Sequence, residues 1–219
     1  MFLSLNAFSQ ALEEKIEKFL LENPEIILKS LQNFEEKKAK EQEVTNEKII
    51  NENLDSLTDS SNGLYDGNIN SKKILVKFFD YNCSYCKKAH TDIQKLLEKE
   101  DIKVVYKNFP ILSENSVFLA KLGIFIAEKD IDSFNSFYKM INENKGRVSK
   151  EKLSEITKKL GVNLDELNNE QVNSRLEKKL KEDVDLANKL GLRGTPAFVV
   201  GNEIIFGYVP ADELLNKMN

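Results

Sequence analysis

Two cysteines stand three residues apart, Cys83 and Cys86, with Ser84 and Tyr85 between them. Residues at this spacing lie on the same face of a helix, so the two sulfurs are close enough to form a disulfide. The pair follows a run of apolar, β-favouring residues, 74–79, and precedes a helix-forming stretch. A thiol at the start of a helix faces unpaired backbone N–H groups and the positive end of the helix dipole, which favour the thiolate. The pattern predicts a redox pair in which Cys83 is the exposed attacking sulfur and Cys86 the deeper, resolving sulfur.

Other interpretations of the cysteine pair stay open at this point. With His90 the pair could supply three ligands to a zinc ion, although His90 lies two turns further along the helix. The same separation, roughly 10 Å of helix rise, is too long for His90 to serve as the base of a cysteine hydrolase. The cysteines could also be unrelated core residues. We favour redox chemistry, with no metal site and a surface position for His90.

A second candidate site is Gly194-Thr195-Pro196, directly before the apolar run 197–200. Proline lacks the N–H that a sheet ladder needs, and is tolerated at the first residue of a strand. A cis bond between Thr195 and Pro196 would expose the backbone of Thr195 at a tight turn. That backbone could then pair with an extended substrate segment as an added strand. The alternative is an ordinary trans proline that opens a strand.

The residues around these two sites predict an α/β fold. The apolar runs 74–79 and 102–106 are expected to be strands, with a helix over 87–99 between them. A strand–helix–strand unit of this kind joins parallel strands through a right-handed crossover. Residues 113–190 have a helical pattern throughout. The chain is then expected to form an antiparallel hairpin over 197–206, turning at Gly201-Asn202, and a short helix from Pro210 to about Met218.

The N-terminal segment, residues 10–61, differs in composition from the rest of the chain. Between Gln10 and Ser56, seven lysines stand against twelve acidic residues. Such a segment contains too little apolar surface to fold alone. Its apolar stripe either packs back on the main domain or meets the same stripe in other subunits, and we favour the second, a helical oligomerisation stalk with a charged linker. The stripe comprises Leu12, Ile16, Phe19, Leu20, Ile27, Leu31 and Phe34, and after the charged run Ile50, Leu54 and Leu57.

The first nine residues, MFLSLNAFS, have some features of an export signal. Small residues, Ala7 and Ser9, stand at the two positions that a signal peptidase inspects, but no basic region precedes the short apolar stretch. Residues 1–9 are therefore either the remnant of an export signal or a short disordered or packed N-terminus.

Charge and hydropathy exclude two broad classes of protein. The 32 basic and 36 acidic residues give a formal net charge of −4, and no basic cluster is present, which excludes a nucleic-acid partner held by phosphate contacts. No apolar run is long enough for a transmembrane helix.

Three segments together resemble a known family. FFDYNCSYCKKAH, VVYKNFPIL and LGLRGTPAFVVGNEIIFGY, in this order over residues 62–219, resemble the DsbA-like branch of the thioredoxin-fold thiol:disulfide interchange proteins. The N-terminal extension, with FLLENPEIILKSLQNFEEKK, resembles that of the oligomeric, ScsC-like members with disulfide isomerase activity.

The resemblance implies a thioredoxin-like fold with a helical insertion at about 113–189, and a cis proline at Pro196 facing Cys83 and Cys86. It also implies export to the periplasm, unfolded or misoxidised client proteins, a membrane redox partner that resets the cysteine pair, and no cofactor. Thr195 before the cis proline is similar to the residue found in the family's isomerases, whereas the strong oxidases usually have valine.

Two departures from the family pattern concern residues that modulate the pair. Ser84-Tyr85 replaces the Pro-His of the strongly oxidising members, so we expect a less extreme reduction potential. Lys77 stands where these proteins commonly carry a buried acidic residue. A buried lysine is costly unless it is neutral or paired, and its charge would favour a Cys86 thiolate.

These observations lead to an exported thiol:disulfide oxidoreductase, with isomerase favoured over monomeric oxidase. The alternative from another class is a non-catalytic binding or chaperone module that has kept a thioredoxin frame. The presence of both cysteines together with Gly-Thr-Pro argues against that alternative, since simple binding needs neither.

Overall fold

The computed structural model describes residues 3–218, and within them the side chains of residue 10 and of residues 12–218. The chain divides into two compact units, one up to Thr45 and one from Asn46 onward. The expected signal remnant at 1–9 lies outside the described side chains, and its first two residues lie outside the description altogether. None of the described helices has the length and apolar character needed to cross a bilayer.

The first unit consists of helix α1 (Leu3–Glu22) and most of helix α2 (Pro24–Glu52). The break at Asn23 follows from the sequence: the Asn23 amide donates to the Phe19 carbonyl at 2.7 Å, and proline is well suited to the first position of α2. Six apolar side chains at helical spacing are exposed by 43–58%: Leu12, Ile16, Phe19, Ile27, Leu31 and Phe34.

The end of α2 and the short helix α3 (Leu54–Thr58) belong to the second unit. Ile50 and Leu57 are each only 1% exposed and lie in one core cluster with Val76 and Phe78 of the central strand. From the sequence we expect this region to belong to the stalk and the domain to begin at residue 62. The structure differs because these two apolar side chains pack on the sheet instead of continuing the exposed stripe.

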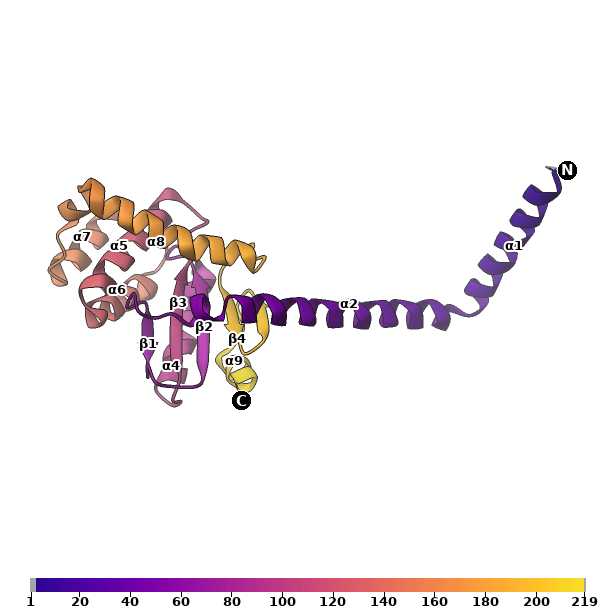
Figure 1. Ribbon diagram of the computed structural model, residues 1–219, viewed down its shortest axis with the longest axis horizontal. Helices are drawn as coiled ribbons and strands as arrows, with labels where there is room; N and C mark the ends of the chain where they lie inside the picture. Colours follow the sequence, from indigo (N-terminus) through magenta and orange to yellow (C-terminus); the bar gives the residue numbers. More distant parts are fainter. Residues whose placement is uncertain (1–2, 219) are drawn as a thin grey trace. The chain divides into compact units, whose positions relative to one another are not determined.

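A five-stranded sheet forms the centre of the second unit (Figure 1). Its strands follow the order β1-β3-β2-β4-β5, in which β2 and β3 are parallel and all other pairs are antiparallel. The predicted central strand, parallel crossover and C-terminal hairpin are confirmed, whereas the sequence analysis did not find β1. The strands are β1 (Tyr65–Gly67), β2 (Ile74–Phe79), β3 (Lys103–Asn108), β4 (Ala197–Val200) and β5 (Glu203–Phe206).

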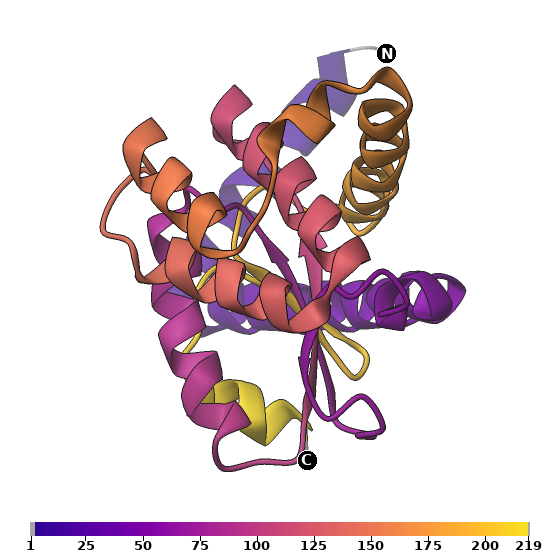
Figure 2. The ribbon, with the colours of Figure 1, turned by 90° about the vertical axis from the view of Figure 1, so that its left-hand side faces the viewer.

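Helices cover both faces of this sheet. Figure 2 shows α4 (Ser84–Leu97) and α9 (Ala211–Met218), in magenta and yellow, on one side, and α8 (Glu170–Lys189) on the other. Alternate residues of β2 point to the two faces, so that Phe79 belongs to the core cluster under α4 and Phe78 to the cluster under the C-terminal end of α8. Ala89, Ile93 and Leu96 of α4 are buried, as their spacing predicts.

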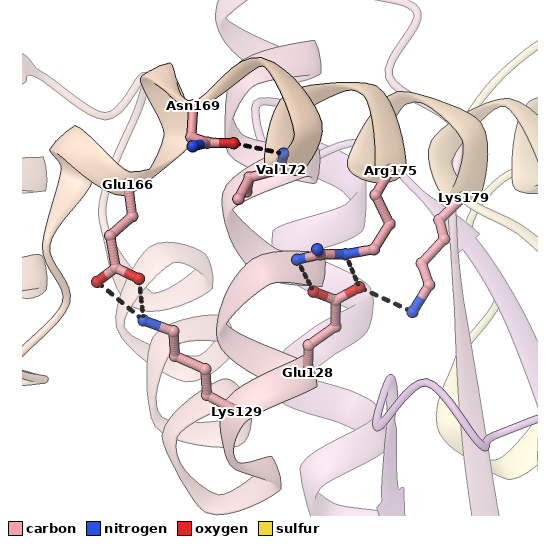
Figure 3. Close-up of polar contacts among 7 residues, drawn as sticks. All are labelled: Glu128, Lys129, Glu166, Asn169, Val172, Arg175 and Lys179. Carbon is pink, nitrogen blue, oxygen red and sulfur yellow. Dashed lines mark hydrogen bonds and ion pairs between the residues drawn. The ribbon is translucent and has the colours of Figure 1, made fainter.

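The helical insertion consists of α5 (Glu114–Lys129), α6 (Ile131–Glu143), α7 (Lys150–Lys159), the 3-10 turn η1 (Leu164–Asn168) and α8. Polar contacts join its first helix to its last (Figure 3). Glu128 accepts two hydrogen bonds from Arg175, at 3.2 and 2.9 Å, and pairs with Lys179 at 2.8 Å. Lys129 pairs with Glu166 at 2.8 Å. Asn169 caps α8 by accepting from the backbone N–H of Val172 at 3.2 Å. These contacts fix α8 over α5, so that α8 reaches back to the sheet.

Candidate functional site

Cys83 occupies the N-cap of α4, and its sulfur accepts a hydrogen bond from the backbone N–H of Cys86 at 3.4 Å. Both cysteines are free thiols. Cys86 is fully buried, as the sequence predicts, but the expectation of an exposed Cys83 is wrong, since only 7% of its surface is accessible. The loop before β4 covers the Cys83 sulfur, since the Cys83 thiol donates a hydrogen bond to the carbonyl oxygen of Thr195 in this loop at 3.2 Å.

The two thiols have opposite acidities. The hydrogen bond from the Cys86 side chain is the main cause that lowers the pKa of Cys83 to about 6, and hydrogen bonds from Thr195 and from the backbone of Cys86 and Tyr85 add to it against the effect of burial. Burial, followed by that same contact with Cys83, raises the pKa of Cys86 well above its usual value. At neutral pH Cys83 is therefore a thiolate and Cys86 a thiol. Disulfide exchange requires this arrangement, because a thiolate attacks the client disulfide and the second cysteine stays protonated until it resolves the mixed disulfide.

The Thr195–Pro196 bond is cis, as the family resemblance implies, and the trans alternative that the residues alone left open is wrong. The loop that carries it is fastened to the far end of the C-terminal hairpin, because the Gly207 N–H donates to the Pro196 carbonyl at 2.9 Å. Thr195 is half-buried and Pro196 buried at the start of β4. The structure thus brings Thr195 from the C-terminal part of the chain against the N-cap cysteine.

Lys77, on β2, lies fully buried behind Cys86. Its Nζ donates to the Cys86 carbonyl at 3.1 Å and to the Tyr138 hydroxyl at 3.0 Å, and lies 5.5 Å from the centre of the Tyr138 ring. Burial lowers the pKa of Lys77 to about 8, although the two cysteines act in the opposite direction. Among the described residues no carboxylate lies within 4.0 Å of this ammonium group.

Ser84 and Tyr85, between the cysteines, are exposed, Tyr85 by 62%. The Tyr85 ring lies beside that of Tyr208, with ring centres 6.5 Å apart. Tyr208 is held in turn by a 2.6 Å hydrogen bond to Asp92 and by Lys88, whose Nζ is 4.1 Å from the ring centre. Nothing in the sequence pattern marks Tyr208, because it meets Tyr85 only through the fold.

His90 is buried, and the surface position expected from the sequence is wrong. It is 3% exposed, and its ring centre lies 5.3 Å from that of Tyr138. Burial lowers its pKa to about 3, so it is neutral. His90 follows Cys86 by four positions and shares its core-facing side of α4, which explains the burial. Within residues 3–218 no group of three or more Cys, His, Asp or Glu side chains is placed to hold a metal ion.

Tyr138 is the member of this site that sequence reasoning missed. It comes from α6 in the helical insertion, and its ring packs among aromatic side chains from three elements, with centres 4.3 Å from Tyr106 and 5.1 Å from Phe79. Its only signal in the sequence is an apolar helical face, which does not distinguish a core tyrosine from a functional one.

Comparisons with known proteins agree with this geometry. Residues 74–219 match the family model described as the DSBA-like thioredoxin domain. The chain belongs to this family. The match covers the cysteine pair, the helical insertion and the cis-proline loop.

Three individual proteins similar to this DSBA-like chain illustrate the match, and the names of the first two concern disulfides. The probable disulfide bond formation protein D of Bacillus cereus is 26% identical in a 141-residue alignment that covers 58% of this chain and 65% of that protein, so the chain spans slightly less than two thirds of that relative's length. The thiol-disulfide exchange protein alpha-DsbA2 of Wolbachia pipientis is 27% identical and covers 81% of this chain and 96% of its own, with a TM-score of 0.73. Proteus mirabilis ScsC in a compact conformation is 26% identical, covers 89% and 96%, and has a TM-score of 0.66. These similarities support a thiol-disulfide oxidoreductase.

Proposed function

We propose that this chain is a thiol:disulfide oxidoreductase of exported client proteins, with disulfide isomerisation favoured over net oxidation. One observation carries the proposal: a thiolate-prone Cys83, with a pKa of about 6, lies at the N-cap of α4 beside a buried Cys86 that stays protonated. This asymmetry suits a nucleophile that forms a mixed disulfide and a second thiol that resolves it.

The proposed reaction begins when the Cys83 thiolate attacks a client disulfide. A new S–S bond forms between Cys83 and one client sulfur, and the other client sulfur leaves as a thiolate. In isomerisation a client thiolate, either the first one formed or one released by its attack on another client disulfide, then attacks the client sulfur of the mixed disulfide. A new client disulfide forms, the bond to Cys83 breaks, and Cys83 is released as a thiolate without net oxidation. If Cys86 attacks Cys83 first, the client leaves reduced and the pair becomes a disulfide. The low pKa of Cys83 makes it a good leaving group in the isomerisation route, whereas in the route through Cys86 the client sulfur leaves.

We assign client binding to the backbone of Thr195 and Pro196. In its thiol form Cys83 donates a hydrogen bond to the Thr195 carbonyl oxygen at 3.2 Å. Ionisation of Cys83 removes the proton and with it this hydrogen bond. The carbonyl is then free to accept a backbone N–H from an extended client segment. Ser84 and Tyr85 flank the sulfur on the exposed side, where they modulate access and potential.

The exposed apolar side chains of α1 and α2 support a homo-oligomer formed through the N-terminal helices. Phe19, Leu31 and Phe34 are each more than half exposed, and such a stripe is normally covered in an assembly. An assembly would present several Cys83 sites to one misoxidised client. We place the protein in the periplasm, with a membrane redox partner that keeps the pair reduced and with no cofactor.

Refolding of a scrambled, disulfide-containing model protein tests the proposed activity. The wild-type protein should restore native disulfides without an added oxidant, and Cys83→Ser should abolish this activity. Cys86→Ala should retain part of it, because shuffling through Cys83 does not require resolution. Full activity of Cys83→Ser would favour the non-catalytic binding module. Oxidation of a reduced model protein without any shuffling would favour the oxidase.

A matched pair of variants in the intact chain tests the assembly. Leu31→Glu places a charge on the exposed stripe, whereas Gln32→Glu places the same charge at the neighbouring exposed position. Light scattering should show dissociation of the first variant only, with loss of isomerase activity and retention of simple disulfide reduction. Equal activity of the dissociated variant would remove the link between assembly and isomerisation.

A further inference from the structure

We propose that Tyr138 positions the ammonium group of Lys77 beside Cys86, and that this buried charge stabilises the Cys86 thiolate when it resolves a mixed disulfide. The inference rests on the proposed function and deepens it by naming the residues that control the resolving step. Lys77 and Tyr138 lie 61 positions apart in the sequence, so the helical insertion contributes directly to the redox site.

The geometry places the charge where it acts on Cys86. Lys77 Nζ contacts the Cys86 backbone oxygen at 3.1 Å, and the Tyr138 hydroxyl holds the same nitrogen from the other side at 3.0 Å. An ammonium group has three N–H donors, and no third acceptor lies within hydrogen-bond distance among the described residues. One donor therefore has no protein acceptor among the described residues while Cys86 is a thiol, and the ammonium charge interacts electrostatically with the Cys86 side chain.

The groups that face Lys77 do not neutralise it. From α4 and its N-cap these groups are Cys83, Cys86 and His90, and from α6 the group is Tyr138. In the sheet, Lys77 is paired with Tyr106 of β3 and Phe198 of β4. His90 is neutral, partly because Lys77 repels its protonated form. A buried charge without a counter-ion strongly favours the ionisation of a nearby acid. In this pocket the acid is the Cys86 thiol.

The resolving step balances without a further reactant. Cys86 loses a proton to solvent and becomes a thiolate beside the Lys77 ammonium. The thiolate attacks the Cys83 sulfur of the mixed disulfide, the Cys83–Cys86 bond forms, and the bond between Cys83 and the client breaks. The departing client sulfur takes up a proton from solvent, while Lys77 keeps its own throughout. Lys77 thus lowers the free energy of the thiolate without exchanging a proton.

Release of glutathione from a mixed disulfide on Cys83 measures this step without a protein client. The full-length protein is loaded with glutathione at low pH, the pH is raised, and the loss of glutathione is followed by acid quenching and mass spectrometry. Lys77→Met, which keeps the side-chain length and removes the charge, should slow release at least ten-fold at pH 7. Tyr138→Phe should slow it several-fold. Lys103→Met removes another buried lysine, at the start of β3, and should leave the rate unchanged.

The pH profile separates an electrostatic role from a structural one. Below pH 8, where Lys77 keeps its proton, the rise of the release rate with pH reports Cys86 ionisation, and the rate at a given pH should be lower in Lys77→Met and, less, in Tyr138→Phe. An unchanged rate and profile in a folded Lys77→Met variant would overturn the proposal, and a wild-type rate in Tyr138→Phe would overturn the role of Tyr138. Because the probe is glutathione, failure of the protein to shuffle client disulfides is a separate result that leaves this test intact.

Discussion

Both faces of the sheet bury lysine side chains, and the surroundings of Lys77 on one face differ from those of Lys107 on the other. Lys77 points to the α4 face, among aromatic rings and the cysteine pair. Lys107 points to the opposite face, where its Nζ donates to the Asp59 carbonyl at 3.2 Å and lies 3.9 Å from the Asp183 carboxylate. Asp183, from α8, also accepts from the backbone and side chain of Asn108, at 2.8 and 3.1 Å.

This difference distinguishes a structural charge from a functional one. The Lys107–Asp183 pair joins β3 to α8 beside the end of α3, and each charge partly offsets the burial of the other, although burial still raises the pKa of Asp183 to about 6. Lys77 has no such partner, so its burial reduces the free energy of unfolding. A protein retains an unfavourable group of this kind where activity depends on it, and here it lies directly behind the resolving cysteine.

The largest expected effect comes from breaking the paired charge. Lys107→Met leaves the Asp183 carboxylate buried without a cation, which should reduce the free energy of unfolding by about 3 kcal/mol. Urea unfolding at pH 7 measures this change. Adding Asp183→Asn should recover part of the loss, and a Lys107→Met variant as stable as wild type would show that the pair contributes nothing.

On the other face of the sheet we expect removal of the buried lysine to raise the free energy of unfolding. Lys77→Met replaces an unpaired buried charge by an apolar side chain of similar length, and should raise the free energy of unfolding at pH 7 by about 2 kcal/mol. The same urea experiment compares the two variants directly. If Lys77→Met lost as much stability as Lys107→Met, the distinction between the two lysines would be wrong.

The pH dependence of stability sharpens the comparison further. The pKa of Lys77 is about 8 in the folded chain against an ordinary value of 10.5, so between these values the unfolded chain binds the proton that the folded chain has released. Stability from this group is therefore gained as the pH rises from 8 to 10.5 and is lost as it falls through 8. The stability advantage of Lys77→Met over wild type should shrink across this window in urea titrations. A constant difference would contradict the assignment.

The smallest effect is expected at the surface contacts that join α5 to α8. Glu128→Gln removes the charge that pairs with Arg175 and Lys179, whose side chains are about half and one-third exposed. Solvent screens such pairs, so the loss should be about 1 kcal/mol or less, with no change in glutathione release. A change in the release rate would mean that the insertion controls the site through more than Tyr138.

Local patterns in the sequence predicted the parts of the site that lie within one segment. The strand at 74–79, the helix after it, the cysteine pair and the hairpin follow from apolar spacing and turn residues, and the family resemblance added the cis bond at Pro196. The contacts of Tyr138, His90 and Tyr208 could not be predicted in the same way. Each depends on which helix face meets the sheet, and no single-residue pattern encodes a hydrogen bond across 61 positions.

The predicted start of the domain, residue 62, is too late for a related reason, since the second unit begins at Asn46. Ile50 and Leu57 continue the helical spacing of the exposed stripe, so the sequence assigns them to the stalk. Their burial at 1% exposure depends on an apolar sheet face that only the folded domain supplies.

The reduction potential of the Cys83–Cys86 pair, from equilibration of the full-length protein with glutathione buffers, tests the central claim most directly. A thiolate-prone Cys83 stabilises the reduced form, and the account predicts a value of roughly −120 to −200 mV, the range of oxidising and isomerising exported enzymes. A value near −270 mV, the level of thioredoxin, would contradict the account and make the protein a reductase.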